Sequence, residues 1–552
     1  MKITGILLTV ISLFCSIVVA IYFLVLLKGK NKAKKTVVKD DAREQQKINN
    51  MRRVFLTDPL SEKTRPTSFN EIIGQDRGLL ALKAAICGPN PQHVIIYGEP
   101  GIGKTAAARI ALDIAKGIYN SPFTHDAKFI EIDGTTLRFD ERGVADPLIG
   151  SVHDPIYQGA GAYGSAGIPQ PKMGAVTKAH GGILFIDEIG ELHPNQMNKL
   201  LKVLEDRKVF LESSYYTEGD VNIPNHIHDI FKNGLPADFR LVGATTCQPS
   251  EITPALRSRC MEVFFDSLGR EDIKKITINA LEKSMFKYED GVPELVVDYA
   301  SNGRDAVNMV QTAGSIANLD KRANITVKDM EWVIETGHYQ PRIYKRVEPG
   351  HRVGFVNGLA VTGLGSGRLL EVEAIFEPCQ GKEGRLTISG IIDEEEFHNK
   401  STSSKRTSSA KASVSNALTL IENLIGISRD DYNIHINYPG GLPVDGPSAG
   451  IAIFVALYSA ILKKPISREI AMTGEIGILG KVYPVGGVYS KVTSAKLAGV
   501  KKVIIPIDNM QSSFEDFGIE IIAVSNIEEV IQSVFNEDIR DIKDMAQDLL
   551  NA

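Results

Sequence analysis

The stretch GEPGIGKT, residues 98–105, fits the pattern G-x-x-x-x-G-K-[ST] of a phosphate-binding loop. Its members are Gly98, Glu99, Pro100, Gly101, Ile102, Gly103, Lys104 and Thr105. A short apolar run, HVIIY, precedes it, and a helical pattern, TAAARIALDI, follows. In that context the glycines let backbone N–H groups surround phosphates at the positive end of the helix. Lys104 is expected to reach the β- and γ-phosphates and Thr105 to bind Mg²⁺. The alternative is a glycine-rich turn that matches by chance, but such a turn would need neither the preceding strand nor the following helix.

A second apolar run ends in two carboxylates, as residues 183–188 read ILFIDE. Such a strand would bring Asp187 and Glu188 to the phosphate-binding loop. We expect Asp187 to hold magnesium and Glu188 to polarise the attacking water. Together the two motifs predict an ATP-hydrolysing site with ATP and Mg²⁺ as its cofactors.

The alternation of short apolar runs with helical patterns predicts an α/β domain at residues 65–266, with a parallel sheet and helices on both faces. Residues 267–336 have a helical pattern and predict a separate helical subdomain. A proline-containing linker, 337–350, then leads to a second domain of strands and helices, the α+β region 351–552. The fold class is therefore α/β and multidomain.

Composition agrees with several globular domains, because 552 residues are too many for one core. The chain is 43% hydrophobic with a net charge of −5, so it offers no global basis for specific nucleic-acid binding. Its five cysteines are scattered without a C-x-x-C pair, which suits a reducing compartment. His226, His228 and Asp229 alternate as possible ligand types for a metal, but the sequence shows no third ligand to complete the site.

The N-terminus predicts a membrane anchor at residues 1–27. Residues 3–27 carry no charge, which is long enough for a spanning helix, and five lysines follow within residues 28–35. A cleaved signal peptide would have a shorter apolar region and a small-residue cleavage site. The lysines place the remainder of the chain in the cytoplasm, after a charged tether at 28–64, and so predict a single-pass protein of the cell membrane.

Residues 446–450, GPSAG, fit the G-x-S-x-G pattern of a serine nucleophile at Ser448. The last histidine of the chain, His435, comes before this serine, so the usual base is missing from the expected place. Ser448 could instead be a helix cap. A buried lysine can act as the base, because desolvation lowers its pKa. Lys491, which follows the Gly486-Gly487 turn, is favoured only weakly over other lysines on the residues alone.

The N-terminal motifs resemble those of AAA+ ATPases: FNEIIGQDRGLLALKAAI, the phosphate-binding loop, FIDEI, GATT and PALRSR. The resemblance implies that residues 267–336 form a helical lid. It also implies that Thr246 is a sensor of the nucleotide and that Arg304 is a second sensor on the lid. It also implies that Arg259 is an arginine finger for a neighbour's ATP, with Arg257 as a competitor, and that the subunits form a ring, usually of six. A glycine-rich stretch with Tyr157 and Tyr163 could grip a polypeptide in the pore or be an ordinary surface loop.

The C-terminal motifs resemble the Lon protease family: VGFVNGLAVTGLGSGRLLEVEAI, PVDGPSAG, MTGEIGILGKVYPVGGVYSK and AGVKKVIIP. The resemblance implies Ser448 as nucleophile and Lys491 as its base. It also implies that Asp445, Thr473 and Glu475 support the site.

With a membrane span where cytosolic Lon proteases carry a large N-terminal domain, the chain is most similar to the B-type Lon proteases of endospore-forming bacteria. That implies an ATP-dependent endopeptidase for unfolded or regulatory proteins, hexameric and active in protein quality control, sporulation and the forespore. A remodelling ATPase with an inactive Lon-like domain is the alternative, but it would lack the serine or the lysine.

Overall fold

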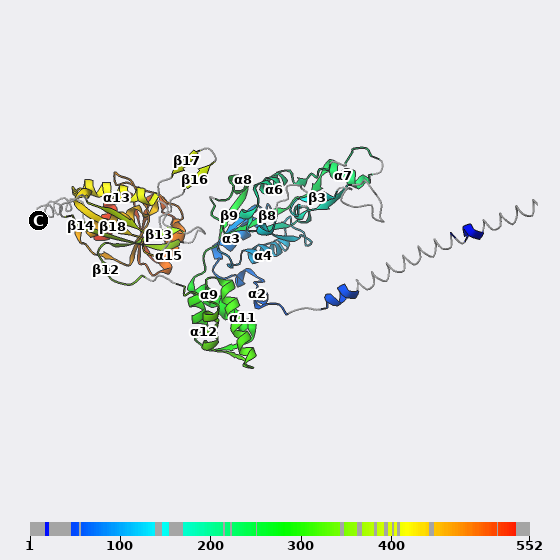
Figure 1. The fold of residues 1–552 in the computed structure, drawn as a ribbon, viewed down its shortest axis with the longest axis horizontal. Helices are drawn as coiled ribbons and strands as arrows, with labels where there is room; N and C mark the ends of the chain where they lie inside the picture. Colours follow the sequence, from blue (N-terminus) through cyan, green and yellow to red (C-terminus); the bar gives the residue numbers. More distant parts are fainter. Residues whose placement is uncertain are drawn as a thin grey trace, which may run out of the picture. The chain divides into compact units, whose positions relative to one another are not determined.

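The computed structural model divides the chain into two units, Met1–Lys63 and Thr64–Ala552 (Figure 1). The residues that it describes are 17–20, 22, 46–53, 57–137, 146–153, 169–213, 216–220, 223–249, 251–342, 347–361, 367–379, 384–390, 396–399, 402–405, 409–440, 447–515 and 517–536.

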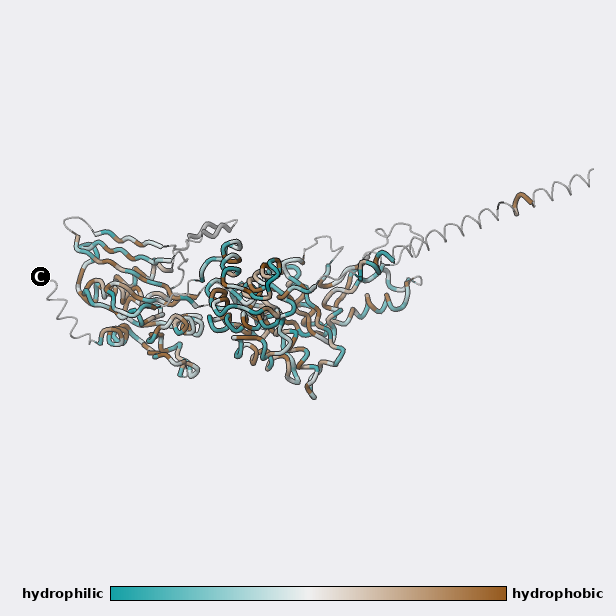
Figure 2. Tube along the Cα trace, turned by 90° about the horizontal axis from the view of Figure 1, so that it is seen from below, coloured by the Kyte–Doolittle hydropathy of each residue, from teal (hydrophilic) through white to brown (hydrophobic). Residues whose placement is uncertain are grey.

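In the N-terminal unit, residues 17–20 and 46–51 are helical, and the first of these stretches is hydrophobic (Figure 2). The short helix α2 spans Leu60–Lys63. Among the described residues, no helix combines the length and apolar character that crossing a membrane requires. Most of the predicted anchor, 1–27, and much of the tether, 28–64, lie outside the described residues.

A five-stranded parallel sheet forms the centre of the nucleotide-binding region. Its strands are β1 (His93–Tyr97), β2 (Phe129–Asp133), β5 (Ile183–Asp187), β8 (Arg240–Thr245) and β9 (Cys260–Phe264). They lie in the order β2-β5-β8-β1-β9, and each neighbouring pair is parallel. All five carboxyl ends therefore meet at one edge, where the phosphate-binding loop begins after β1. The predicted parallel sheet is confirmed.

Helices cover both faces of this sheet, which agrees with the nearly continuous burial along β1, β5 and β8. They are α3 (Asp76–Ile86), α4 (Lys104–Lys116), α5 (Ala175–Lys178), α6 (Pro194–Asp206), α7 (Asn225–Asn233) and α8 (Pro254–Arg257). Figure 1 shows α6 and α8 above the strands and α3 and α4 below them. Ile95 and Tyr97 of β1 share a core cluster with Met197 and Leu200 of α6.

Two small antiparallel pairs extend from this region. They are β3 (Gly150–His153) with β4 (Gln170–Met173), and β6 (Lys208–Val209) with β7 (Leu235–Pro236). The first pair flanks residues 154–168, so Tyr157 and Tyr163 of the possible gripping loop lie outside the described residues.

The helical pattern after residue 267 folds as predicted into four helices with one short strand pair. These elements are α9 (Arg270–Ser284), α10 (Val292–Tyr299), α11 (Gly303–Leu319) and α12 (Val327–Thr336), with β10 (Lys287–Tyr288) and β11 (Asn324–Ile325). Two of the helices begin at side-chain caps, where Asn302 accepts from the Asp305 N–H and Thr326 from the Asp329 N–H. Such caps satisfy backbone donors that the first helical turn leaves unpaired.

A mixed seven-stranded sheet organises the C-terminal region. Its order is β15-β18-β14-β13-β20-β23-β24. These strands are β13 (Phe355–Val361), β14 (Gly367–Pro378), β15 (Leu386–Ser389), β18 (Tyr432–Asn437), β20 (Ile470–Met472), β23 (Lys502–Pro506) and β24 (Glu520–Val524). Short pairs outside it are β12 (His351–Arg352) with β19 (Ile466–Ser467), β16 (Glu396–Asn399) with β17 (Thr402–Lys405), and β21 (Glu475–Ile476) with β22 (Val482–Tyr483).

Helices cover both faces of this sheet as well. They are α13 (Ser409–Ile425), α14 (Gly450–Leu462), α15 (Val488–Leu497) and α16 (Ile527–Phe535). Figure 1 shows α13 above the sheet and α15 below it. The first eleven residues of α14, from Gly450 to Ala460, are all buried, which agrees with the nearly continuous apolar sequence of that helix. Its side chains form one cluster with α13 and the sheet.

We predict that Leu457→Ala destabilises α14, because the fully buried side chain leaves a cavity that its neighbours fill only in part. The opening free energy from hydrogen exchange of α14 amides should fall by about 2–5 kcal/mol. Leu479→Ala is the matched control, since that leucine is 92% exposed, and it should shift the same value by less than about 0.5 kcal/mol. Equal shifts for the two variants would contradict the packing described here.

Candidate functional site

The phosphate-binding loop joins the carboxyl end of β1 to the start of α4. Gly101 lies in the left-handed region at φ 76°, and a Cβ there would sit 2.8 Å from the side-chain oxygen of Asn302. Only glycine therefore allows both the turn and the close approach of the residues that precede α11. The same Cβ would lie 3.2 Å from the Cβ of Arg304, so the start of α11 brings Arg304 to the loop.

Lys104 is the first residue of α4, and its side chain is buried against the end of β8. Its amine donates to the carbonyl oxygens of Gly98 at 2.5 Å and Thr245 at 3.3 Å. Burial lowers the pKa of this amine, while the charges of Glu188 and Asp187 act in the opposite direction. The carboxylates favour the charged form, which is the form that binds phosphate.

Asp187 and Glu188 stand at the carboxyl edge of the sheet, where β5 ends. Burial and the charge of Glu188 raise the pKa of Asp187. Glu188 has a left-handed backbone, with φ 48°, and its carboxylate accepts from the Thr246 backbone N–H at 2.9 Å and from the Thr246 hydroxyl at 3.0 Å. The structure thus unites the predicted water-polarising residue with the predicted sensor.

The two competing arginines of PALRSR have different partners. Arg257 is paired within its own chain, because its Nε and Nη2 donate to the two carboxylate oxygens of Glu262 at 2.6 and 3.2 Å. Arg259 donates instead to the backbone oxygen of Ala255 and to Glu205 of α6. No motif in the sequence indicates Glu262, because the pair depends on β9 following the α8 turn.

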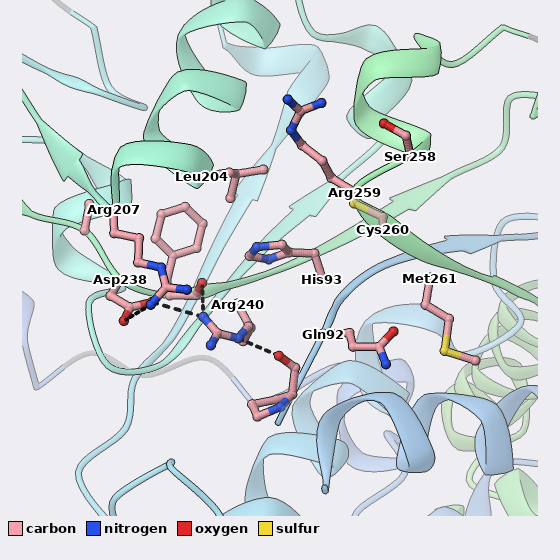
Figure 3. Close-up of a pocket in the computed structure, with 13 residues that line it drawn as sticks. Gln92, His93, Leu204, Arg207, Asp238, Arg240, Ser258, Arg259, Cys260 and Met261 are labelled. Carbon is pink, nitrogen blue, oxygen red and sulfur yellow. Dashed lines mark hydrogen bonds and ion pairs between the residues drawn. The ribbon is translucent and has the colours of Figure 1, made fainter. Parts of the chain in front are cut away.

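Arg259 borders a cavity of about 420 Å³ at the amino edge of the sheet, opposite the phosphate-binding loop (Figure 3). The cavity is lined by three arginines, Arg207, Arg240 and Arg259, together with His93 at the start of β1. Burial, with the positive charges of Arg240 and Arg207, lowers the pKa of His93 to about 4. The neutral ring accepts at Nδ1 from the Leu241 N–H, which is a structural role.

The alternating residues considered as metal ligands, His226, His228 and Asp229, lie in α7. His228 is hydrogen-bonded to the Tyr216 hydroxyl and to the Asp220 carbonyl oxygen. Within the described ranges, no group of three or more histidine, cysteine or acidic side chains is arranged to hold a metal ion.

In the C-terminal region, Ser448 lies in a 3₁₀ turn, Pro447–Ala449, directly before α14. The N-cap of α14 is Ala449, with no side-chain cap hydrogen bond. Ser448 is therefore not the cap of this helix, and the helix-cap interpretation is wrong. Its carbonyl oxygen accepts from the Gly474 N–H at 2.9 Å, which fixes the serine to the segment after β20.

Thr473 connects Ser448 with Lys491. The Lys491 amine donates to the Thr473 hydroxyl at 3.0 Å, and that hydroxyl lies 3.2 Å from the Ser448 carbonyl oxygen. Thr473 is fully buried at the end of β20, next to Glu475 of β21. The two residues that the Lon resemblance pairs, 43 positions apart in the sequence, thus share one hydroxyl group.

Lys491 is held in the first turns of α15 and is only 2% exposed. Burial lowers the pKa of its amine from 10.5 to about 8, and no charge among the described residues opposes the shift. A neutral amine can take a proton from a serine hydroxyl.

His435 occupies a different place. It lies in β18, where its Nε2 is 2.8 Å from the Ser389 hydroxyl, and it is register-paired with Ile375 of β14. Asp445, the remaining supporting residue of the resemblance, lies outside the described residues.

Comparisons with known proteins agree with these features. Residues 324–537 match the model of the Lon protease (S16) C-terminal proteolytic domain, and residues 68–228 match that of magnesium chelatase, subunit ChlI. "Lon protease 2" of Bacillus subtilis is 55% identical over 525 residues, which cover 95% of each chain.

Archaeal proteins are more distant relatives. "Archaeal Lon protease" of Archaeoglobus fulgidus is 30% identical over 443 residues, covering 71% of this chain and 66% of that protein. Its counterpart in Methanothermobacter thermautotrophicus is 28% identical, over 77% of this chain and 68% of that protein. With a phosphate-binding loop on a parallel sheet and a serine and a buried lysine joined through one threonine, the chain belongs to the Lon protease family and is an ATP-dependent Lon-type serine protease.

Proposed function

We propose that Ser448 is the nucleophile of this protease, that Lys491 is its base, and that Thr473 positions the base. The observation that carries the proposal is the buried Lys491 amine, whose hydrogen-bond partner Thr473 also contacts the Ser448 backbone. Burial favours the neutral amine, which is the form a base requires.

The reaction is an acyl transfer in two stages. Ser448 Oγ attacks the carbonyl carbon of the scissile peptide bond while Lys491 Nζ takes its proton. The C–N bond then breaks as the lysine returns that proton to the leaving amine, which leaves an ester on Ser448. Lys491 next takes a proton from water, whose oxygen attacks the ester, and the proton returns to Ser448 as the carboxylic acid product departs.

ATP is bound in this proposal by the phosphate-binding loop, with Lys104 at the β- and γ-phosphates. Thr105 and Asp187 would hold Mg²⁺, and the half-buried Asp187, whose pKa is raised by burial and by Glu188, suits a site that a cation completes. The ion would neutralise charge on the phosphates. Glu188 would orient the attacking water, Thr246, which hydrogen-bonds Glu188, would sense the γ-phosphate, and Arg304 would reach the nucleotide from α11.

We further propose that subunits assemble as a ring, with six as the expected number, in which Arg259 reaches a neighbour's ATP. Arg257 is the weaker candidate because Glu262 holds it in a bidentate ion pair. Nucleotide turnover in such a ring would unfold protein substrates and pass them to Ser448.

Residues 1–27 are proposed as a single membrane span that keeps both activities on the cytoplasmic side. The uncharged run from residue 3 to residue 27 and the lysines after it carry this proposal. Anchored rings would meet substrates near the inner face of the membrane.

We predict that two variants separate the activities. Ser448→Ala should abolish cleavage of casein yet leave ATP hydrolysis close to the wild-type rate, because the nucleophile is lost and the nucleotide site is intact. Glu188→Gln should slow ATP hydrolysis by about 10²-fold or more and stop degradation of folded proteins, while short peptides are still cut. Casein cleavage by Ser448→Ala near the wild-type rate would contradict the proposed nucleophile.

Proteolysis should depend on pH through the buried amine of Lys491. Since only the neutral amine accepts a proton, kcat/KM for a short peptide should rise with pH, with a midpoint near the Lys491 pKa of about 8, and level off above it. ATP hydrolysis measured in parallel serves as the control. A midpoint near 10.5 would show an unperturbed lysine, and one near 6.5 would indicate a histidine base.

Removal of residues 1–27 should convert a membrane-bound protein into a soluble one that keeps both activities, because the catalytic residues all lie beyond the tether. Fractionation of cells expressing full-length or truncated protein measures this, with external protease testing the orientation. Full-length protein that stays in the supernatant at high salt, or is digested from outside, would refute the anchor.

A further inference from the structure

Arg259 has two hydrogen-bond partners inside its own subunit. Its Nη1 donates to the Ala255 carbonyl oxygen at 2.8 Å, and its Nη2 donates to the carboxylate of Glu205. The side chain is still about one-third exposed, and Glu205 more than half. Figure 3 shows Arg259 pointing away from the group formed by Arg207, Asp238 and Arg240 across the same cavity.

These contacts conflict with the role proposed for Arg259. An arginine finger stabilises charge on a transferring phosphoryl group through its terminal N–H donors. Here each terminal nitrogen already uses one N–H within the chain, and a carboxylate neutralises the guanidinium. A phosphate of a neighbouring subunit therefore has to compete with Glu205 for the charge of the Arg259 guanidinium.

We propose that Glu205 is a positioning residue that restrains Arg259 until a neighbour's nucleotide displaces it. This inference rests on the proposed arginine finger. Glu205 never touches the nucleotide and acts only through the guanidinium.

The location of Glu205 gives the restraint a connection to the nucleotide site of its own subunit. Glu205 is near the end of α6, and α6 begins at Pro194, six residues after Glu188. Met197 and Leu200 fix the helix to the core that also contains Ile189, directly after Glu188. A helix of 13 residues spans about 20 Å, so α6 extends rigidly from the segment after the water-polarising residue to the finger.

The strength of the pair suits a restraint that can be released. Exposed ion pairs shift an equilibrium only ~1.4- to 5-fold, so a phosphate with several negative charges competes readily for the guanidinium. Arg257 differs, because its bidentate pair with Glu262 is supported by the Tyr97 hydroxyl, which also hydrogen-bonds Glu262.

The first experiment measures ATP hydrolysis by the full-length protein without substrate. Glu205→Gln keeps the length of the side chain but removes its charge, and it should raise kcat about two- to fivefold with KM for ATP little changed. Asp206→Asn, one position further on the same helix end, is the matched control and should leave both constants unchanged. The Glu205→Gln effect should vanish in the Arg259→Ala background and shrink at high salt.

A second experiment tests whether the effect acts on the neighbour. Subunits that carry Glu188→Gln are mixed with wild-type subunits, so that only wild-type sites hydrolyse ATP. Adding Glu205→Gln to the inactive subunits should raise the rate of the mixture, because Arg259 of those subunits serves wild-type neighbours. Thermal unfolding and particle size establish that the variants fold and assemble equally.

The outcomes separate the two proposals. If Arg259→Ala lowers ATP hydrolysis strongly but Glu205→Gln matches Asp206→Asn or lowers kcat, the restraint is refuted and the finger stands. If Arg259→Ala hydrolyses ATP at the wild-type rate, the finger fails and the restraint fails with it. If Glu205→Gln raises kcat of its own ring but never that of the mixture, the charge acts in its own site and the proposed restraint is wrong.

Discussion

The hydrogen bond from the buried amine of Lys491 to Thr473 is the interaction on which the proteolytic region depends. An amine removed from water needs a polar partner, and a hydroxyl supplies one without adding a charge. A carboxylate in that place would favour the ammonium form and remove the base. The hydroxyl instead leaves burial as the dominant influence, so the pKa falls to about 8. The same hydroxyl contacts the Ser448 backbone, which joins the proposed base to the proposed nucleophile at the residue after β20.

Lys104 shows how a different environment gives a lysine a different task. It too is buried and its pKa is lowered, but Glu188 and Asp187 oppose that shift. Lys104 is therefore suited to bind phosphate as a cation, and Lys491 to accept a proton. The contrast comes from the carboxylates at the carboxyl edge of one sheet, whereas for Lys491 burial is the cause of the shift among the described residues.

The end of β8 gathers several groups of the nucleotide site. Lys104 donates to the Thr245 carbonyl oxygen, and Glu188 accepts two hydrogen bonds from Thr246. A parallel sheet makes this possible, because β1, β5 and β8 all end at the same edge although their sequences are far apart. At the opposite edge, Arg259 lies beside Glu205, so the proposed finger is presented away from the nucleotide site of its own subunit.

The sequence alone determined the parallel sheet, the helical segment after residue 267 and the second α/β region, because periodicity and glycine-rich motifs are local signals. It also indicated Lys104, Asp187 and Ser448 from short motifs. Only the tertiary structure decided that Ser448 is not the cap of α14, that Thr473 joins Ser448 to Lys491, and that Glu262 holds Arg257 while Glu205 holds Arg259. Each of these depends on burial or on a contact between elements that chain folding brings together. The spacing of residues along one segment predicts neither the burial nor the contact.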